Sequence, residues 1–233
     1  MSQAEHPHNQ LDQVICQIRF PAQLSVDRNI DLFQDRVREE YPDYAPEQIV
    51  PLGVANPPGA CHIFTSSDGA WSISISTGAM SLTTRRYENW VDFETRFAFA
   101  FDAFREVFKV ESFTRIGLRY INAIRPSALG LEEKAETVLR GPVSDLFSQT
   151  SGTFRAGSCI LDRAFDEGTL GRTAVGTIVF TDNQPGYAID NDVFICGNYA
   201  GDDVMGILRK FNGISNELFK EMASEELCRR VGL

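Results

Sequence analysis

The chain has 233 residues, of which 43% are hydrophobic, and it carries a formal net charge of −10. This composition supplies enough apolar surface for a folded core and excludes disorder for most of the chain. The acidic charge excludes general nucleic-acid binding and disfavours anionic membrane surfaces, because both depend on clustered Lys and Arg.

The cysteines indicate a reducing compartment. The five are scattered and form no C-x-x-C pair; they are Cys16, Cys61, Cys159, Cys196 and Cys228. No run approaches the roughly 18 apolar residues of a membrane span. The polar segment Met1–Gln10 lacks the layout of a signal peptide. We therefore expect a cytoplasmic protein with no membrane association and a disordered tail over residues 1–11.

Residues 12–110 predict a strand, a helix, three strands and a long helix. The expected elements are the strand Val14–Phe20, the helix Ile30–Tyr41, the strand region His62–Thr84 and the helix Tyr87–Phe108. Between them, Pro42–Ala60 holds five of the ten prolines. This segment is expected to be a long loop, either functional at an interface or pinned to its own domain.

The long helix carries a stripe of aromatic residues at three- and four-residue steps. The stripe comprises Trp90, Phe93, Phe97, Phe101, Phe104 and Phe108. Each ring contributes ~1.5–3 kcal/mol of transfer free energy when buried, so this helix is predicted to form the main seam of the core.

Residues 111–233 predict the same order of elements again. The expected elements are the strand Arg115–Ile124, the helix Leu131–Phe147 broken at Gly141-Pro142, the strands Cys159–Phe165, Ala174–Phe180 and Ile189–Cys196, and the helix Val204–Met222.

The repeated order favours an internal duplication. Ile18-Arg19-Phe20 matches Leu118-Arg119-Tyr120 locally, which would place Arg19 and Arg119 at equivalent positions. The predicted fold is α+β, with duplicated β-α-β-β-β-α units whose antiparallel sheets are each covered by long helices. It would resemble the TATA-binding-protein-like and helix-grip folds, as a single compact domain or two closely packed halves.

No motif indicates a metal, a cofactor or a catalytic set. His6 and His8 lie in the tail, which leaves His62 alone, and no His or Cys pair has zinc spacing. Neither a nucleophile elbow nor a glycine-rich phosphate loop is present. We therefore predict no catalytic residues, no metal site and no cofactor.

Arginines and aspartates on two strands form the first candidate site. Asp190 and Asp192 share one face of a strand, and so do Arg115 and Arg119. Two hypotheses stay open: an acidic pair facing water, or a buried Arg–Asp network. We expect Arg119 and Asn122 to face inward, with Arg119→Ala costing ~3 kcal/mol or more.

A second candidate lies where the aromatic helix begins. Arg85 and Arg86, together with Tyr87 and Trp90, could hold an anionic group. The alternative is that the two arginines lie on a solvated turn.

The run Arg115–Asn122 resembles a sporadically distributed bacterial family of uncharacterised proteins. The opening Arg19-Phe20-Pro21, the core Gly117-Leu118-Arg119-Tyr120-Ile121-Asn122 and the late Asp190-x-Asp192 strand carry this resemblance, which covers nearly the whole chain. Asn191 departs from the pattern, where an apolar residue is usual, and this would place its strand nearer an edge. The resemblance implies an association with horizontally moved genes, including toxin–antitoxin and phage-defence modules.

Three classes of function remain open. The favoured one is a non-catalytic accessory protein that acts through a protein partner or as a homodimer, in a toxin–antitoxin or phage-defence module. The second is a small-molecule-binding helix-grip domain with a cavity lined by Phe97, Phe101 and Tyr120. The third is a hydrolase or nuclease that depends on the Asp190 and Asp192 carboxylates.

Overall fold

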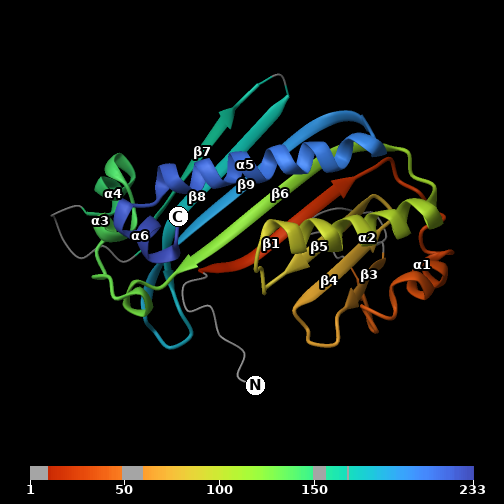
Figure 1. Cartoon of the computed structure of the whole chain (residues 1–233), viewed down its shortest axis with the longest axis horizontal. Coiled ribbons are helices and arrows are strands. Elements are labelled where there is room, and N and C mark those ends of the chain that lie inside the picture. Colours follow the sequence, from red (N-terminus) through yellow and green to blue (C-terminus); the bar gives the residue numbers. More distant parts are fainter. Residues whose placement is uncertain (1–9, 49–59, 149–155, 167) are drawn as a thin grey trace.

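The computed structural model describes residues 10–48, 60–148, 156–166 and 168–233. Its strands form one nine-stranded antiparallel sheet in the order β2-β3-β4-β5-β1-β6-β9-β8-β7 (Figure 1). The strands are β1 (Leu11–Arg19), β2 (Asp43–Gln48), β3 (Ala60–Thr65), β4 (Trp71–Ser76), β5 (Ala79–Thr84), β6 (Ser112–Ile124), β7 (Ser158–Ala164), β8 (Thr169–Val179) and β9 (Pro185–Ala200).

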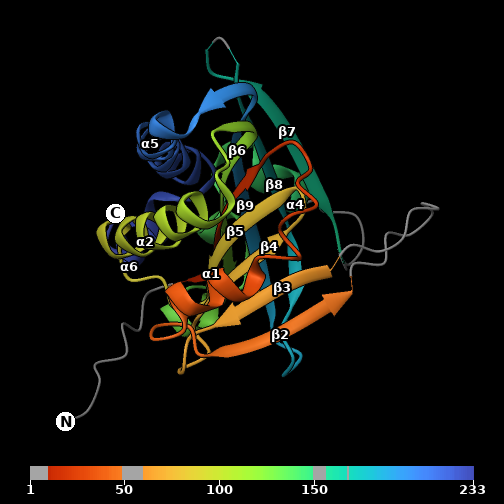
Figure 2. The same ribbon diagram turned by 90° about the vertical axis from the view of Figure 1, so that its right-hand side faces the viewer.

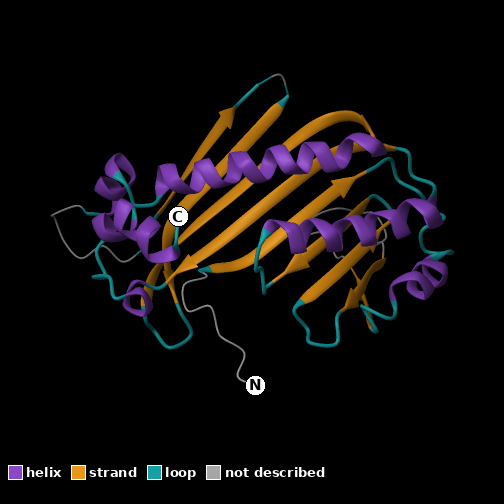
Figure 3. Ribbon diagram, viewed as in Figure 1, coloured by secondary structure: helices purple, strands orange, loops and turns teal. Residues whose placement is uncertain are grey.

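The helices gather on one side of this sheet, as Figures 2 and 3 show. They are α1 (Ile30–Val37), α2 (Trp90–Phe108), α3 (Ala135–Val138), α4 (Gly141–Phe147), α5 (Val204–Met222) and α6 (Glu225–Val231), with short 3-10 turns η1 (Pro126–Leu129) and η2 (Gly201–Asp203). We call the face under the helices the covered face and the other the open face. No helix in the described chain has the length and apolar character needed to span a membrane.

The alternation of β1 explains why one face is covered. Val14, Cys16 and Ile18 are fully buried, whereas Ile15 and Gln17 point to the open face. Cys16 lies opposite Leu118 of β6, so the two buried sets meet in register. The central strands therefore present a continuous apolar surface to the helices.

Helix α2 forms the predicted aromatic seam. The Asn89 side chain caps it by accepting a hydrogen bond from the Asp92 N–H at 3.0 Å. Phe93, Phe97 and Phe104 are completely buried. The prediction that this stripe belongs to the core is confirmed.

The predicted duplication into units with separate sheets is wrong. β1 pairs with β5 on one side and β6 on the other, so a single sheet continues through the centre of the molecule. The two halves also differ, because the first adds the edge strand β2 and the second has α3 and α4 where the first has α1. Arg19 lies opposite Arg115, while Arg119 lies opposite Ile15. Arg19 and Arg119 thus lie in neighbouring antiparallel strands of the same sheet.

The segment Pro42–Ala60 is a strand in its first part. Asp43–Gln48 forms β2, and residues 49–59 lie outside the described residues. β2 is an edge strand, where Pro46 is tolerated because its missing N–H removes no bond on the outer side. Of the expected tail, residues 1–9 lie outside the described residues, but Leu11 already belongs to β1.

The second half differs from the sequence prediction in its helices. The helix predicted over Leu131–Phe147, with a break at Gly141-Pro142, is two short helices, and the first begins only at Ala135. The second begins at Gly141, whose φ of +45° suits glycine. The sequence analysis missed α6, which the Ser224 side chain caps by accepting from the Leu227 N–H at 3.0 Å. The bounds predicted for α5 are confirmed.

Truncating a ring in the seam should destabilise the fold. Phe97 is fully buried and stacks on Phe101 with ring centroids 5.5 Å apart. We expect Phe97→Ala to lower the free energy of unfolding by about 3–5 kcal/mol, because it removes apolar contacts and leaves a cavity. Urea unfolding measures this loss. Val91→Ala, on the same helix but 70% exposed, is the matched control and should leave stability nearly unchanged.

The homodimer stays a prediction, but the structure indicates a different strand as its pairing edge. The strand Trp71–Ser76 has small hydroxyls and no charge on one face, a pattern that favours a pairing edge. This strand is β4, however, and it lies between β3 and β5. In the described chain β7 is the edge without a proline, and its Ile160 is 60% exposed. Light scattering over a concentration series should give twice the 26.0 kDa chain mass, and Ile160→Lys should return it to the chain mass. A wild-type mass of 26.0 kDa at high micromolar concentration would contradict the dimer.

Candidate functional site

A row of polar residues crosses the covered face of the sheet. Tyr120 on β6 lies opposite Asn191 on β9, which in turn lies opposite Thr173 on β8. Asn191 is completely buried and Thr173 is 1% exposed. Polar groups at such depth destabilise the fold unless they form hydrogen bonds. Their presence in the middle of an apolar face therefore needs an explanation.

Hydrogen bonds hold most of this polar row in place. Thr173 Oγ1 donates to Asn191 Oδ1 at 2.8 Å, and the Tyr120 hydroxyl donates to Oδ1 of Asn212 on α5 at 2.8 Å. Next to the row, Asn122 Nδ2 donates to the carbonyl oxygen of Ile189 at 3.1 Å. Burial raises the pKa of Tyr120 well above its ordinary value, so the phenol stays neutral.

Two buried polar atoms facing this region have no hydrogen-bond partner in the described chain. They are Asn191 Nδ2 and Ser215 Oγ. Ser215 is 3% exposed and lies in the stripe of α5 that packs on the sheet, among residues such as Phe211 and Leu218. Leaving a buried donor unsatisfied costs about 1–3 kcal/mol. These two groups are therefore candidates for binding a ligand.

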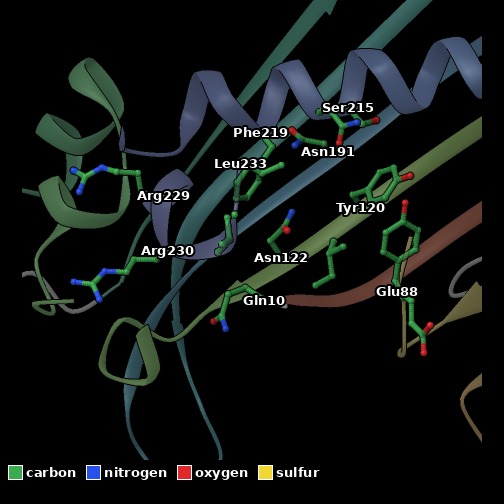
Figure 4. Close-up of a pocket in the computed structure, with 15 residues that line it drawn as sticks. Gln10, Glu88, Tyr120, Asn122, Asn191, Ser215, Phe219, Arg229, Arg230 and Leu233 are labelled. Carbon is green, nitrogen blue, oxygen red and sulfur yellow. The ribbon is translucent and has the colours of Figure 1, made fainter. Parts of the chain in front are cut away.

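Both residues line a pocket of about 610 Å³ between α5, α6 and the sheet (Figure 4). Figure 4 shows Asn191 below the part of α5 that carries Ser215. Most of the remaining wall surface is apolar, and polar residues that include Gln10, Asn122 and Asn216 complete the lining. The aromatic and aliphatic residues are Leu11, Tyr87, Tyr120, Phe219, Val231 and Leu233. Binding sites for small molecules are typically apolar pockets of this size with a few polar groups placed inside.

The charged residues around the pocket do not point into it. Arg229 and Arg230 extend away from it in Figure 4, and both are paired with Glu226, at 2.6 and 3.0 Å. Glu88 is exposed at the rim. The side chains that face the pocket are therefore neutral.

The predicted Arg–Asp set lies on the open face, away from the pocket. Arg115 Nη2 is 2.9 Å from Asp192 Oδ2, and Arg119 Nε is 2.8 Å from Asp190 Oδ1. The side chain of Arg119 is 44% exposed, so the expectation that it faces inward is wrong. The hydrogen bond to Asp190 raises the pKa of Arg119.

Local packing fixes the position of Arg115. Its guanidinium lies 4.7 Å from the ring centroid of Phe194 and over Gly117, where a Cβ would come within 2.4 Å of Nη1. Both aspartates are thus held by arginines. In the described residues, no group of three or more His, Cys, Asp and Glu side chains could hold a metal ion.

The sequence candidates at the start of α2 do not form a single anion site. Arg86 pairs with Asp68 at 2.7 Å on the surface, and Arg85 is exposed. Trp90 packs on Phe93, with ring centroids 6.0 Å apart. Of the sequence candidates, the structure brings Asn122, Tyr87 and Tyr120 to the pocket.

Sequence reasoning missed Asn191 and Ser215 as site residues. The departure at Asn191 was interpreted as a sign of an edge strand, which is wrong because β9 lies between β6 and β8. The cavity expected beside Phe97 and Phe101 does not form there either, since both rings fill the core. The available signal was a polar residue interrupting each of two apolar stripes, on β9 and on α5.

Comparison with known proteins adds no family assignment. No family model matches the chain, and no curated protein matches its sequence. The resemblance carried by the Arg115–Asn122 run stays a prediction.

Arginines on the open face should differ in their contribution to stability according to burial, and three of them test this. The exposed fractions of the Arg115, Arg119 and Arg172 side chains are 15%, 44% and 59%. We expect Arg115→Ala to cost about 2–3 kcal/mol, because it removes a largely buried side chain that packs on Phe194 and leaves Asp192 without this partner. Arg119→Ala should cost only about 0.5–1 kcal/mol, because solvent screens the pair.

Urea unfolding of the three variants measures this order. Arg172→Ala is the matched control, because Arg172 bonds Asp162 through Nε and Nη2, as Arg119 bonds Asp190. This variant should show the smallest loss of stability. A loss at Arg119 as large as at Arg115 would contradict the argument from burial.

Proposed function

We propose that this protein binds a small organic molecule in the pocket between α5, α6 and the sheet. The observation that supports this most is that Asn191 Nδ2 and Ser215 Oγ are both buried, both line the pocket and both lack a partner in the described chain. The apolar wall around them would remove most of a ligand's surface from water. We therefore keep the small-molecule-binding function predicted from the sequence, but with a different set of lining residues.

The geometry favours binding over catalysis. Ser215 has no hydrogen-bonded base in the described residues, and a serine hydroxyl is a weak nucleophile without one. Tyr120 is held neutral by burial, and its hydroxyl donates a hydrogen bond to Asn212 Oδ1. The pocket groups are thus suited to recognising a ligand and not to transferring a proton.

The hypothesis of a protein partner stays a prediction. The helices lie on one side of the sheet, so the open face is the surface on which it can be tested (Figure 2). A single stoichiometric partner recovered from the native host, and lost on Arg172→Glu, would support it. Arg36→Glu, on α1, is the control that should retain the partner.

Obstructing the pocket should abolish ligand binding without unfolding the protein. Asn216 lines the pocket but is exposed on α5, so Asn216→Trp should place an indole across the entrance. Glu217→Trp is the matched control, since Glu217 is the next residue, is 73% exposed and does not line the pocket.

Ligand-detected NMR with uncharged aromatic fragments is the measurement, beginning with methyl 2-naphthyl ketone. Fragments that bind the wild type should bind Glu217→Trp and not Asn216→Trp. Fragments that bind all three proteins equally would show that this pocket is not the site.

A further inference from the structure

We infer that the ligand is uncharged and places a hydrogen-bond acceptor, such as a carbonyl oxygen, against Asn191 Nδ2 and Ser215 Oγ. This inference rests on the proposed function and adds the chemical class of the ligand. It has three supports: the direction of the Asn191 amide, the absence of a charged group facing into the described pocket, and the aromatic character of the wall.

The direction of the Asn191 amide is fixed by its neighbour. Thr173 Oγ1 donates to Asn191 Oδ1 at 2.8 Å, so the carbonyl end of the amide is occupied. The opposite end, Nδ2, can only donate hydrogen bonds. A ligand group that satisfies Nδ2 must therefore accept a hydrogen bond. Ser215 Oγ can rotate its proton toward the same acceptor, because no described group engages it.

Charge complementarity excludes ionic ligands. An anion would need a cation in the pocket, but Glu226 holds both Arg229 and Arg230. A cation would need a carboxylate side chain inside, but that of Glu88 is exposed at the rim. Burying an unpaired charge is unfavourable by far more than one hydrogen bond can offset. A neutral acceptor is the group that suits these walls.

The remainder of the ligand is expected to be flat and apolar. Tyr87 and Tyr120 meet edge to face, with ring centroids 5.7 Å apart and planes at 85°. Phe219 adds another ring to the wall. Such rings favour offset or edge contacts with a second aromatic group. An aromatic ketone, ester or amide combines this body with the required acceptor.

Four naphthalene probes of nearly equal size test the inference. They are methyl 2-naphthyl ketone, 2-ethylnaphthalene, 2-naphthoate and 2-naphthylmethylammonium, which present a neutral acceptor, no polar group, an anion and a cation. Dissociation constants are measured by NMR titration at pH 7. The ketone should bind about tenfold more tightly than the hydrocarbon, as expected for one or two new hydrogen bonds, and the two ions should bind more weakly still.

Two variants then assign the selectivity to named atoms. Asn191→Asp keeps an acceptor for Thr173 but replaces the Nδ2 donor with a carboxylate oxygen. It should weaken the ketone about tenfold and strengthen the ammonium probe, a reversal that a purely structural role would not produce. Ser215→Ala, which suits a helix, should weaken the ketone about fivefold and is the second variant should Asn191→Asp not fold.

The possible outcomes separate this inference from the proposed function. If the ketone and the hydrocarbon bind equally well and both are lost in Asn216→Trp, the pocket is a binding site but the acceptor inference is wrong. If 2-naphthoate or the ammonium probe binds wild type most tightly, the inference is also overturned. If none of the four probes binds at millimolar concentration, the proposed function fails, and the inference fails with it.

Discussion

The packing of α2 and α5 on one face of the nine-stranded sheet is the constraint on which the rest of the structure depends. The apolar stripes of both helices, which include Phe97 and Phe211, bury the central strands. Removing that much apolar surface from water is the main favourable term in folding. It also decides which residues become costly, because a polar group on the covered face is separated from solvent.

Because side chains alternate along a strand, neighbouring residues lie on opposite faces of the sheet, and the two faces have different chemistry. On β6, Arg119 lies on the open face and Tyr120 on the covered face, and on β9 Asp190 and Asn191 divide in the same way. Charged residues on the open face can pair while keeping contact with water. The polar residues on the covered face are neutral, and they form hydrogen bonds or line the pocket. Adjacent residues in one motif thus serve unrelated purposes, and only the covered set is placed to bind a ligand.

The sequence analysis succeeded where the relevant forces are local. The bounds of α5 and the core role of the α2 stripe followed from helical spacing, and the shared face of Asp190 and Asp192 followed from strand alternation. It failed where the structure depends on how distant segments of the chain pair. A local resemblance between Arg19 and Arg119 could not reveal that β1 and β6 would pair to make one sheet, nor that β2 would use Pro46 at an edge.

The composition of the core, the alternation of each strand and the presence of an Asn within the apolar pattern of β9 can all be recognised in the amino-acid sequence. Only the tertiary structure decided what that Asn means, because its neighbours, Tyr120, Thr173 and Ser215, come from three other elements. Whether a buried donor is satisfied depends on where distant segments place their acceptors, and no local spacing encodes this. Asn191, from which the sequence predicted a strand nearer an edge, therefore lies in the buried wall of a pocket.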